Sequence, residues 1–186
     1  MTVEQETQPA QPRARAGRLL RTLIVALVAL LLLLAAASWL NSRAFDQLLT
    51  AVEAGESVLG DFNTQAEALV RAQPDEDAAH AYRQSAFWDS ASNLADEART
   101  GLLVEQQHVR DVRIWPWDAD AQRARDRYLD HLAAWERQLK GYADREQANE
   151  GAAIEATFTL LNDALADAVP LLGAEHEGRV KAIAAG

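Results

Sequence analysis

Residues 23–40 read LIVALVALLLLLAAASWL, an apolar stretch of 18 residues that contains no charge. Built as an α-helix, it is about 27 Å long, close to the roughly 30 Å hydrocarbon core of a bilayer. Leu and Ala cover every face of this helix, a pattern that requires an apolar environment all round. The stretch therefore predicts a single transmembrane helix over residues 19–40.

The charges that flank the stretch predict its orientation. Four arginines precede it and only one follows closely, and short cytoplasmic flanks are the ones enriched in Lys and Arg. We expect residues 1–18, which are polar and rich in Pro and Gln, to be disordered and cytoplasmic. Everything after residue 40 is then extracytoplasmic. The arginines are Arg13, Arg15, Arg18 and Arg21 before the stretch and Arg43 after it.

A cleaved signal peptide is the alternative interpretation, because Ala35, Ala36 and Ala37 match a small-residue cleavage pattern. An apolar run of 18 residues exceeds the usual h-region of about 7–15 residues, and no helix breaker precedes the alanines. The length favours an uncleaved signal anchor in the cell membrane.

Composition limits the remaining classes of function. The chain has 186 residues, enough for one domain with appendages. It has no cysteine, which excludes disulfides, thiol catalysis and thiolate metal sites. The net charge of −10 argues against a nucleic-acid partner, which would need clustered basic residues. Arg is abundant and Lys rare, with many alanines, a composition that suggests a GC-rich bacterial genome.

After residue 40, apolar residues recur at spacings of three and four, which indicates amphipathic helices. We expect helices over about 41–73, 76–113, 118–148 and 152–184. Breaks are expected at Pro74, Pro116 and residues 149–151, and a kink at Pro170. No Pro or Gly separates the first run from the membrane segment, so one helix can continue from Leu23. The run comprises Phe45, Leu48, Val52, Gly55, Leu59, Phe62, Ala66 and Leu69.

Four helices of similar length with short loops predict an all-α fold, an up-down-up-down antiparallel four-helix bundle over residues 41–186. The alternative is a pair of helical hairpins that complete their core only in a homodimer.

The sequence IWPWDAD, residues 114–120, closes the second predicted helix. In an up-down bundle this helix returns to the membrane surface, so Trp115 and Trp117 are expected beside Trp39. Indole rings favour the water–lipid interface, and we predict that the three tryptophans form a membrane-interface site. The alternative is that Trp115 or Trp117 closes the bottom of the bundle core.

The pattern nearest to a metal site is E-x-x-H at Glu105 and His108, because residues i and i+3 on a helix can share one metal. Di-iron carboxylate bundles need a second such pair. The chain offers only Asp77 with His80, and His176 between Glu175 and Glu177. Exposed or capping roles are favoured for all of them. We predict no catalytic residue, no metal and no cofactor.

Three further residue types admit a structural and a functional interpretation. Asp118 and Asp120 could hold a cation, but capping of the helix start is favoured. Asparagines beside the apolar runs could line a ligand pocket, although fixing helix register or remaining hydrated is favoured. Single glycines within helices mark close helix approaches or weak points. These residues are Asn63, Asn93 and Asn162, and Gly55, Gly60, Gly101 and Gly141.

The layout from Leu23 onward, one membrane helix that runs directly into a helical bundle, resembles the periplasmic four-helix sensor domains of bacterial chemoreceptors. The resemblance concerns architecture only and implies a ligand-binding bundle. No second membrane helix and no cytoplasmic signalling module follow before Gly186, so we expect no self-contained transmembrane signalling.

These features lead us to expect a non-enzymatic, single-pass membrane protein whose acidic bundle is an interaction module or accessory subunit of a larger bacterial envelope complex. Its expected partners are the lipid bilayer and a membrane or envelope protein. The second hypothesis is a sensor-like ligand-binding bundle that signals through a separate protein. The third is a metal-carboxylate enzyme.

Overall fold

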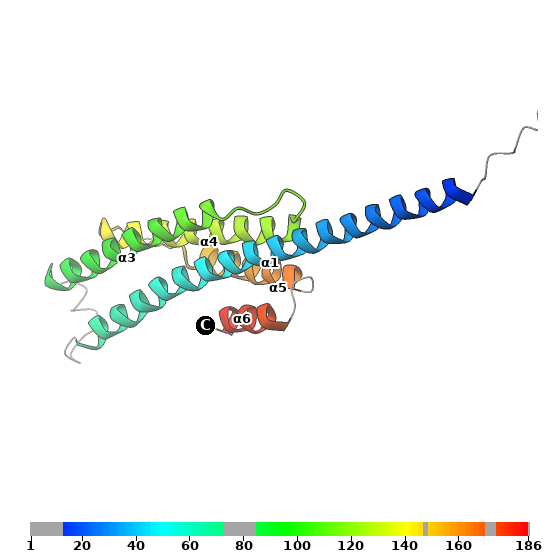
Figure 1. Ribbon diagram of the computed structural model, residues 1–186. Coiled ribbons are helices and arrows are strands. Elements are labelled where there is room, and N and C mark those ends of the chain that lie inside the picture. Colours follow the sequence, from blue (N-terminus) through cyan, green and yellow to red (C-terminus); the bar gives the residue numbers. More distant parts are fainter. Residues whose placement is uncertain (1–12, 73–84, 147–148, 170–173, 186) are drawn as a thin grey trace, which may run out of the picture. The chain divides into compact units, whose positions relative to one another are not determined.

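A computed structural model describes residues 13–72, 85–146, 149–169 and 174–185 (Figure 1). These residues form five helices, and no strand occurs among them. The chain divides into two compact units, Met1–Leu40 and Asn41–Gly186. The helices are α1 (Arg13–Arg71), α3 (Ser85–Asp111), α4 (Ala119–Ala143), α5 (Gly151–Ala168) and α6 (Ala174–Ala185).

The described residues of the first unit, 13–40, form the N-terminal part of α1. Every side chain from Ile24 to Leu34 is exposed, although this stretch contains only apolar residues. Among the described residues, α1 is the one helix long and apolar enough to cross a membrane, a property that membrane anchors and signal sequences share. Residues 13–18 belong to α1 and not to a disordered segment, since their Arg and Ala residues favour helix.

In the second unit, α3, α4 and α5 pack antiparallel one after another, which confirms the antiparallel packing expected from the sequence (Figure 1). The Ser92 hydroxyl on α3 donates to the Ala143 carbonyl on α4, whereas further along α3 Arg99 pairs with Glu136. Numbers that rise on one helix fall on the other, so α3 and α4 are antiparallel. The pairs Arg123–Asp167 and Arg137–Glu150 establish the same relation between α4 and α5.

The apolar runs form the core, as their spacing predicted. On α1, side chains at spacings of three and four are buried while the residues between them face solvent. The other helices contribute one buried stripe each. The largest fully buried apolar side chains are Phe45, Leu48, Leu49, Leu102, Tyr128, Leu132, Leu139, Leu161 and Leu165.

The third predicted helix, 118–148, corresponds to α4. Its start agrees with the prediction, whereas its end does not. The Asp118 carboxylate accepts a hydrogen bond from the Ala121 amide at 3.1 Å, which confirms the predicted N-cap. Helix α4 ends at Ala143 because Arg145 adopts a φ of 58°. The Glu146 amide then donates to the Gly141 carbonyl at 2.8 Å, a left-handed C-terminal cap. Such caps usually contain Gly, so the sequence here did not indicate one.

The fourth predicted helix, 152–184, is two helices, α5 and α6. The predicted kink at Pro170 lies outside the described residues; a proline lacks the amide hydrogen that would continue a helix. Helix α6 lies against α1 and runs in the same direction, because His176 contacts Asp46 and Arg179 contacts Glu53. The described part of the bundle thus contains a fifth helical segment that the apolar spacing did not predict.

The remaining predicted boundaries concern the first two helices of the bundle. Helix α1 extends without interruption to Arg71, as the absence of Pro and Gly from residues 23–54 suggested. The turn at Pro74 and residues 76–84 of the second predicted helix lie outside the described residues. The described part of that helix, α3, ends at Asp111, two residues before the prediction.

Candidate functional site

A cavity of about 570 Å³ lies within the second unit, between α1, α4, α5 and α6. This volume is in the range of about 300–1,000 Å³ that is typical of small-molecule sites. Leu59 on α1, Ile154 and Phe158 on α5, Trp135 on α4 and Ile183 on α6 form its apolar walls. The cavity is open to solvent.

Glu56 and His131 line the cavity, and Tyr128 lies beside both of them; we call these three the floor residues. Glu56 on α1 is 28% exposed and His131 on α4 only 2%, and Glu56 Oε1 lies 3.7 Å from His131 Nε2. The Tyr128 hydroxyl, one helical turn before His131, donates to the Val52 carbonyl oxygen at 3.0 Å. The position of these groups follows from helix periodicity, since residues 128 and 131 share one face of α4.

A glycine allows this close approach between α1 and α4. A Cβ atom built on Gly55 would lie 2.1 Å from the Tyr128 hydroxyl oxygen and 3.2 Å from the adjacent ring carbon. Any larger residue at position 55 would therefore displace the tyrosine. Gly101 on α3 is less constrained, because a Cβ atom there would lie 3.3 Å from the Val58 side chain. A Cβ atom at Gly60 would have no neighbour within 4 Å. The interpretation of Gly55 as a point of close helix contact is confirmed.

Burial dominates the protonation of the floor residues. It raises the pKa of Glu56 from its ordinary 4.5 to about 7, with the neighbouring Tyr128 hydroxyl acting in the opposite direction. Burial also lowers the pKa of His131 from 6.5 to about 4, although a hydrogen bond to the Ile154 backbone opposes this. The pKa of Tyr128 is raised by burial and then by the charge of Glu56. At neutral pH, His131 and Tyr128 are neutral and Glu56 is close to its midpoint.

The neutral histidine has a defined orientation. His131 Nδ1 lies 3.1 Å from the Thr157 hydroxyl oxygen, and that hydroxyl donates to the backbone carbonyls of Ala153 and Ile154. The hydroxyl proton is thus already used, so Nδ1 carries the hydrogen and donates to Thr157. Nε2 is then an acceptor that faces Glu56. His131 Nε2 can therefore accept a hydrogen bond from a molecule bound in the cavity.

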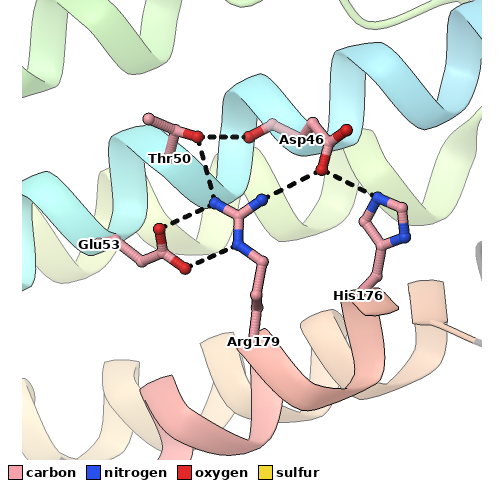
Figure 2. A network of polar contacts seen from close by, with 5 residues as sticks. All are labelled: Asp46, Thr50, Glu53, His176 and Arg179. Carbon is pink, nitrogen blue, oxygen red and sulfur yellow. Dashed lines mark hydrogen bonds and ion pairs between the residues drawn. The ribbon is translucent and has the colours of Figure 1, made fainter. Parts of the chain in front are cut away.

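One wall of the cavity is held by an ion-pair network between α6 and α1 (Figure 2). The Arg179 guanidinium donates twice to the Glu53 carboxylate, at 2.8 Å each, and once to Asp46 at 3.1 Å. It also donates to the Thr50 hydroxyl at 3.1 Å, and His176 Nε2 lies 3.0 Å from the same Asp46 oxygen. This paired geometry is the strong form of a carboxylate–guanidinium interaction, and it lowers the pKa of Glu53. We call these five residues the Arg179 network.

The predicted interface tryptophans are at the surface. Trp115 and Trp117 stack on each other with ring centroids 4.8 Å apart, and they are 38% and 60% exposed. Their loop lies at the same end of the bundle as residue 41. Val112, which precedes the loop, lines the same surface depression as Arg43. Neither ring closes the core, so that alternative is wrong. Trp39 is exposed in the first unit, and a shared membrane level for all three rings stays a prediction.

The sequence motifs considered for metal binding do not converge. His108 Nδ1 lies 3.0 Å from Glu105 Oε2, so the E-x-x-H pair is formed, but His108 is exposed on α3. Asp120 pairs with Arg123 at 3.3 Å. No group of three or more potential metal ligands occurs among the described residues. Of the other motif residues, Asp77 and His80 lie outside them, His176 belongs to the Arg179 network, Glu177 pairs with Lys181, and the side chain of Glu175 is not described.

The three asparagines do not form the pocket considered from the sequence. Asn63 lines the cavity, Asn93 is exposed on α3, and Asn162 is half-buried on α5. The sequence patterns instead gave no prediction for Glu56, for His131 or for the contact between them. One signal was present, because Glu56 lies four residues after Val52 and three before Leu59, inside the apolar stripe of α1. A charged residue at such a position is a candidate for a buried functional group.

Comparison of the chain with family models, with curated proteins and with solved structures found no match. The resemblance of its layout to chemoreceptor sensor domains therefore remains a hypothesis about architecture.

Proposed function

We propose that the chain is a single-pass membrane protein that presents its acidic bundle outside the cytoplasmic membrane, as an interaction module or accessory subunit of an envelope complex. The supporting observation is helix α1, which leads without a break from an exposed apolar stretch, residues 24–34, into the core of a packed domain. A helix of this kind couples the position of the bundle to the membrane surface.

The stacked Trp115 and Trp117 support contact of the bundle with the outer leaflet. An exposed pair of indoles at the end of a bundle is costly in water, whereas the headgroup region accommodates amphipathic rings. In this proposal the tryptophans fix the base of the bundle on the membrane. The rest of the acidic surface is then available to a protein partner.

The test reconstitutes the full chain in vesicles whose lipids carry bromine near the headgroups. Quenching of tryptophan emission is expected, and it should fall clearly when Trp115 and Trp117 are both replaced by Phe. The matched control is Trp135→Phe, which removes a cavity tryptophan and should leave the quenched component unchanged. Equal quenching in the double variant and the parent would contradict contact of this loop with lipid.

The partner is tested by crosslinking in native membranes followed by mass spectrometry. A photoreactive residue at exposed Leu103 or Val104 on α3 is expected to capture a defined membrane or envelope protein. The same reagent at position 117 should report lipid instead. Recovery of the chain alone from every position, after gentle detergent extraction, would count against an accessory-subunit function.

The cavity favours a second candidate function, a small-ligand binding domain that passes its state to a separate protein. Its supporting observation is the combination of apolar walls with the buried pair Glu56 and His131. Apolar cavities with a few convergent polar groups and a perturbed pKa are the usual form of ligand sites.

A further inference from the structure

The charge of the cavity lining is of one sign. Glu53, Glu56 and Glu155 line the cavity, and no Lys or Arg does so among the described residues. Glu53 is neutralised by Arg179 through two hydrogen bonds. His131 adds no positive charge, because burial lowers its pKa to about 4. The cavity therefore repels anions and attracts cations.

The Glu56 Oε1 acceptor in the cavity has no hydrogen-bond donor among the described residues. Glu56 Oε1 is buried and receives no hydrogen bond from the described residues, and at 3.7 Å it is beyond hydrogen-bond distance from His131 Nε2. A buried acceptor without a donor costs free energy, and an ionised one costs more. The side chain lines the cavity, so the donor that it lacks can come from a molecule bound there.

Two aromatic rings stand in the same cavity wall. Trp135 on α4 and Phe158 on α5 both line it, and Phe158 also packs against the His131 ring with centroids 5.3 Å apart. Aromatic faces attract cations through their quadrupole and also accept apolar groups. A ligand that combines a cationic head with an apolar body matches both properties.

We propose that this cavity binds a small organic amine, whose protonated nitrogen donates to Glu56 Oε1 while its apolar body packs against Trp135 and Phe158. The inference rests on the second candidate function and specifies its ligand class. Carboxylic acids are disfavoured by the carboxylates of the lining. Quaternary ammonium ions satisfy the charge but have no N–H for the buried oxygen.

The proposed contact requires an ionised Glu56, so binding depends on pH. Because burial raises the pKa of Glu56 to about 7, the affinity should increase as the pH rises through 7, while an alkylamine stays protonated. The groups that surround Glu56 do not reverse this sign, since each is neutral, already paired or negative. They are Glu53 on α1, Glu105 on α3, Tyr128 and His131 on α4, Glu155 on α5 and Arg179 on α6.

The test titrates phenethylammonium into the full chain, held in nanodiscs of zwitterionic lipid, by isothermal calorimetry near pH 8, about one unit above the pKa of Glu56. Saturable one-to-one binding is expected. Glu56→Gln should weaken it at least about tenfold, since a hydrogen bond to a charged group is worth about 1.5–3 kcal/mol. Glu67→Gln on the same helix is the matched control and should bind like the parent, because Glu67 is exposed and pairs with Arg71.

Three further measurements distinguish a loss of binding from a folding defect. Circular dichroism checks that Glu56→Gln is folded, and Phe158→Leu, which keeps an apolar wall, should weaken binding about threefold through loss of the ring. Lowering the pH to about 5.5 should weaken binding to the parent about tenfold or more without altering Glu56→Gln.

The neutral 2-phenylethanol and the anionic 3-phenylpropionate distinguish a failure of the amine proposal from a failure of the ligand-binding function. Both should bind at least about tenfold more weakly than the amine. Equal binding of the amine to Glu56→Gln, or tighter binding of the alcohol or the acid, would overturn the amine proposal and leave a ligand-binding cavity. No saturable binding of any of the three probes would overturn the amine proposal and count against the second candidate function.

Discussion

Helix α1 carries two different apolar surfaces on one continuous backbone. Between Ile24 and Leu34 every side chain is apolar and exposed, whereas between Phe45 and Phe62 buried apolar residues alternate with exposed polar ones. The backbone geometry is helical in both regions. The difference is the pattern of side chains, since an all-round apolar surface requires an apolar environment on every side and a stripe requires only neighbouring helices. The first region is therefore suited to a membrane and the second to a bundle.

Charges placed in the first region should have the largest effect. Replacing Leu30 and Leu33 by Arg costs roughly 5–7 kcal/mol of membrane insertion, at about 2.5–3.5 kcal/mol for each arginine. The variant should leave the membrane fraction in flotation experiments. Thr100→Arg on the exposed face of α3 is the control and should stay with the membranes. If the double variant also remains there, the apolar stretch is not the anchor.

A second comparison truncates one leucine in each region. Leu48→Ala removes a fully buried side chain and should lower the free energy of unfolding of the bundle by about 2–5 kcal/mol. Leu32→Ala removes an exposed one and should leave the unfolding of the bundle unchanged. Chemical denaturation in detergent, followed by circular dichroism, measures both. Equal destabilisation by the two variants would contradict the division of α1 into two regions.

Within the bundle, the pKa values of Glu56 and His131 predict opposing pH effects. The pKa of Glu56 is raised from 4.5 to about 7, so the folded state favours the protonated side chain. The free energy of unfolding that this preference contributes is lost as the pH rises from 4.5 to 7. The pKa of His131 is lowered from 6.5 to about 4, so its contribution is gained as the pH rises from 4 to 6.5. The two effects nearly cancel in the parent chain between about pH 4.5 and 6.5.

Glu56→Gln removes the pH effect of Glu56 and leaves that of His131. The variant should become more stable relative to the parent as the pH rises from 4.5 to 7, by up to about 3 kcal/mol at 1.36 kcal/mol per pKa unit. Denaturation curves at a series of pH values measure this difference. A difference that is independent of pH would mean that Glu56 titrates normally.

The smallest expected effect concerns the attachment of α6. Arg179→Met keeps the apolar part of the side chain but removes the hydrogen bonds to Glu53, Asp46 and Thr50. Global stability should fall by only about 1 kcal/mol, because the network is partly exposed. Amide hydrogen exchange should increase in α6 and not in α4. Lys181→Met, which breaks the exposed pair with Glu177, is the control and should leave exchange unchanged.

Periodicity predicted the helices and most of the core, because a stripe at spacings of three and four depends only on local sequence. The end of α4 was placed five residues too late, since the left-handed cap falls on Arg145 and not on a glycine. The return of α6 along α1 depends on contacts between residues about 130 positions apart, such as Arg179 with Asp46. Local spacing contains no information about such contacts.

The cavity was harder to predict than the fold for the same reason. His108 was a candidate metal ligand because Glu105 is three residues away, whereas His131 was not a candidate because Glu56 is 75 positions away. Glu56 was nevertheless visible as a charge within an apolar stripe, and Gly55 as a residue that permits close approach. Their combination with Tyr128 appears only when α1 and α4 are packed together.

Labelling of single cysteines tests the central claim most directly, because the natural chain contains none. A cysteine is placed in turn at position 5, at position 31 and at exposed position 97, and intact cells are treated with a maleimide that cannot cross the inner membrane. We predict that position 97 reacts in intact cells, position 5 only after lysis, and position 31 in neither case. Reaction of position 5 in intact cells, or a mature chain that lacks the apolar stretch, would contradict an anchored extracytoplasmic bundle.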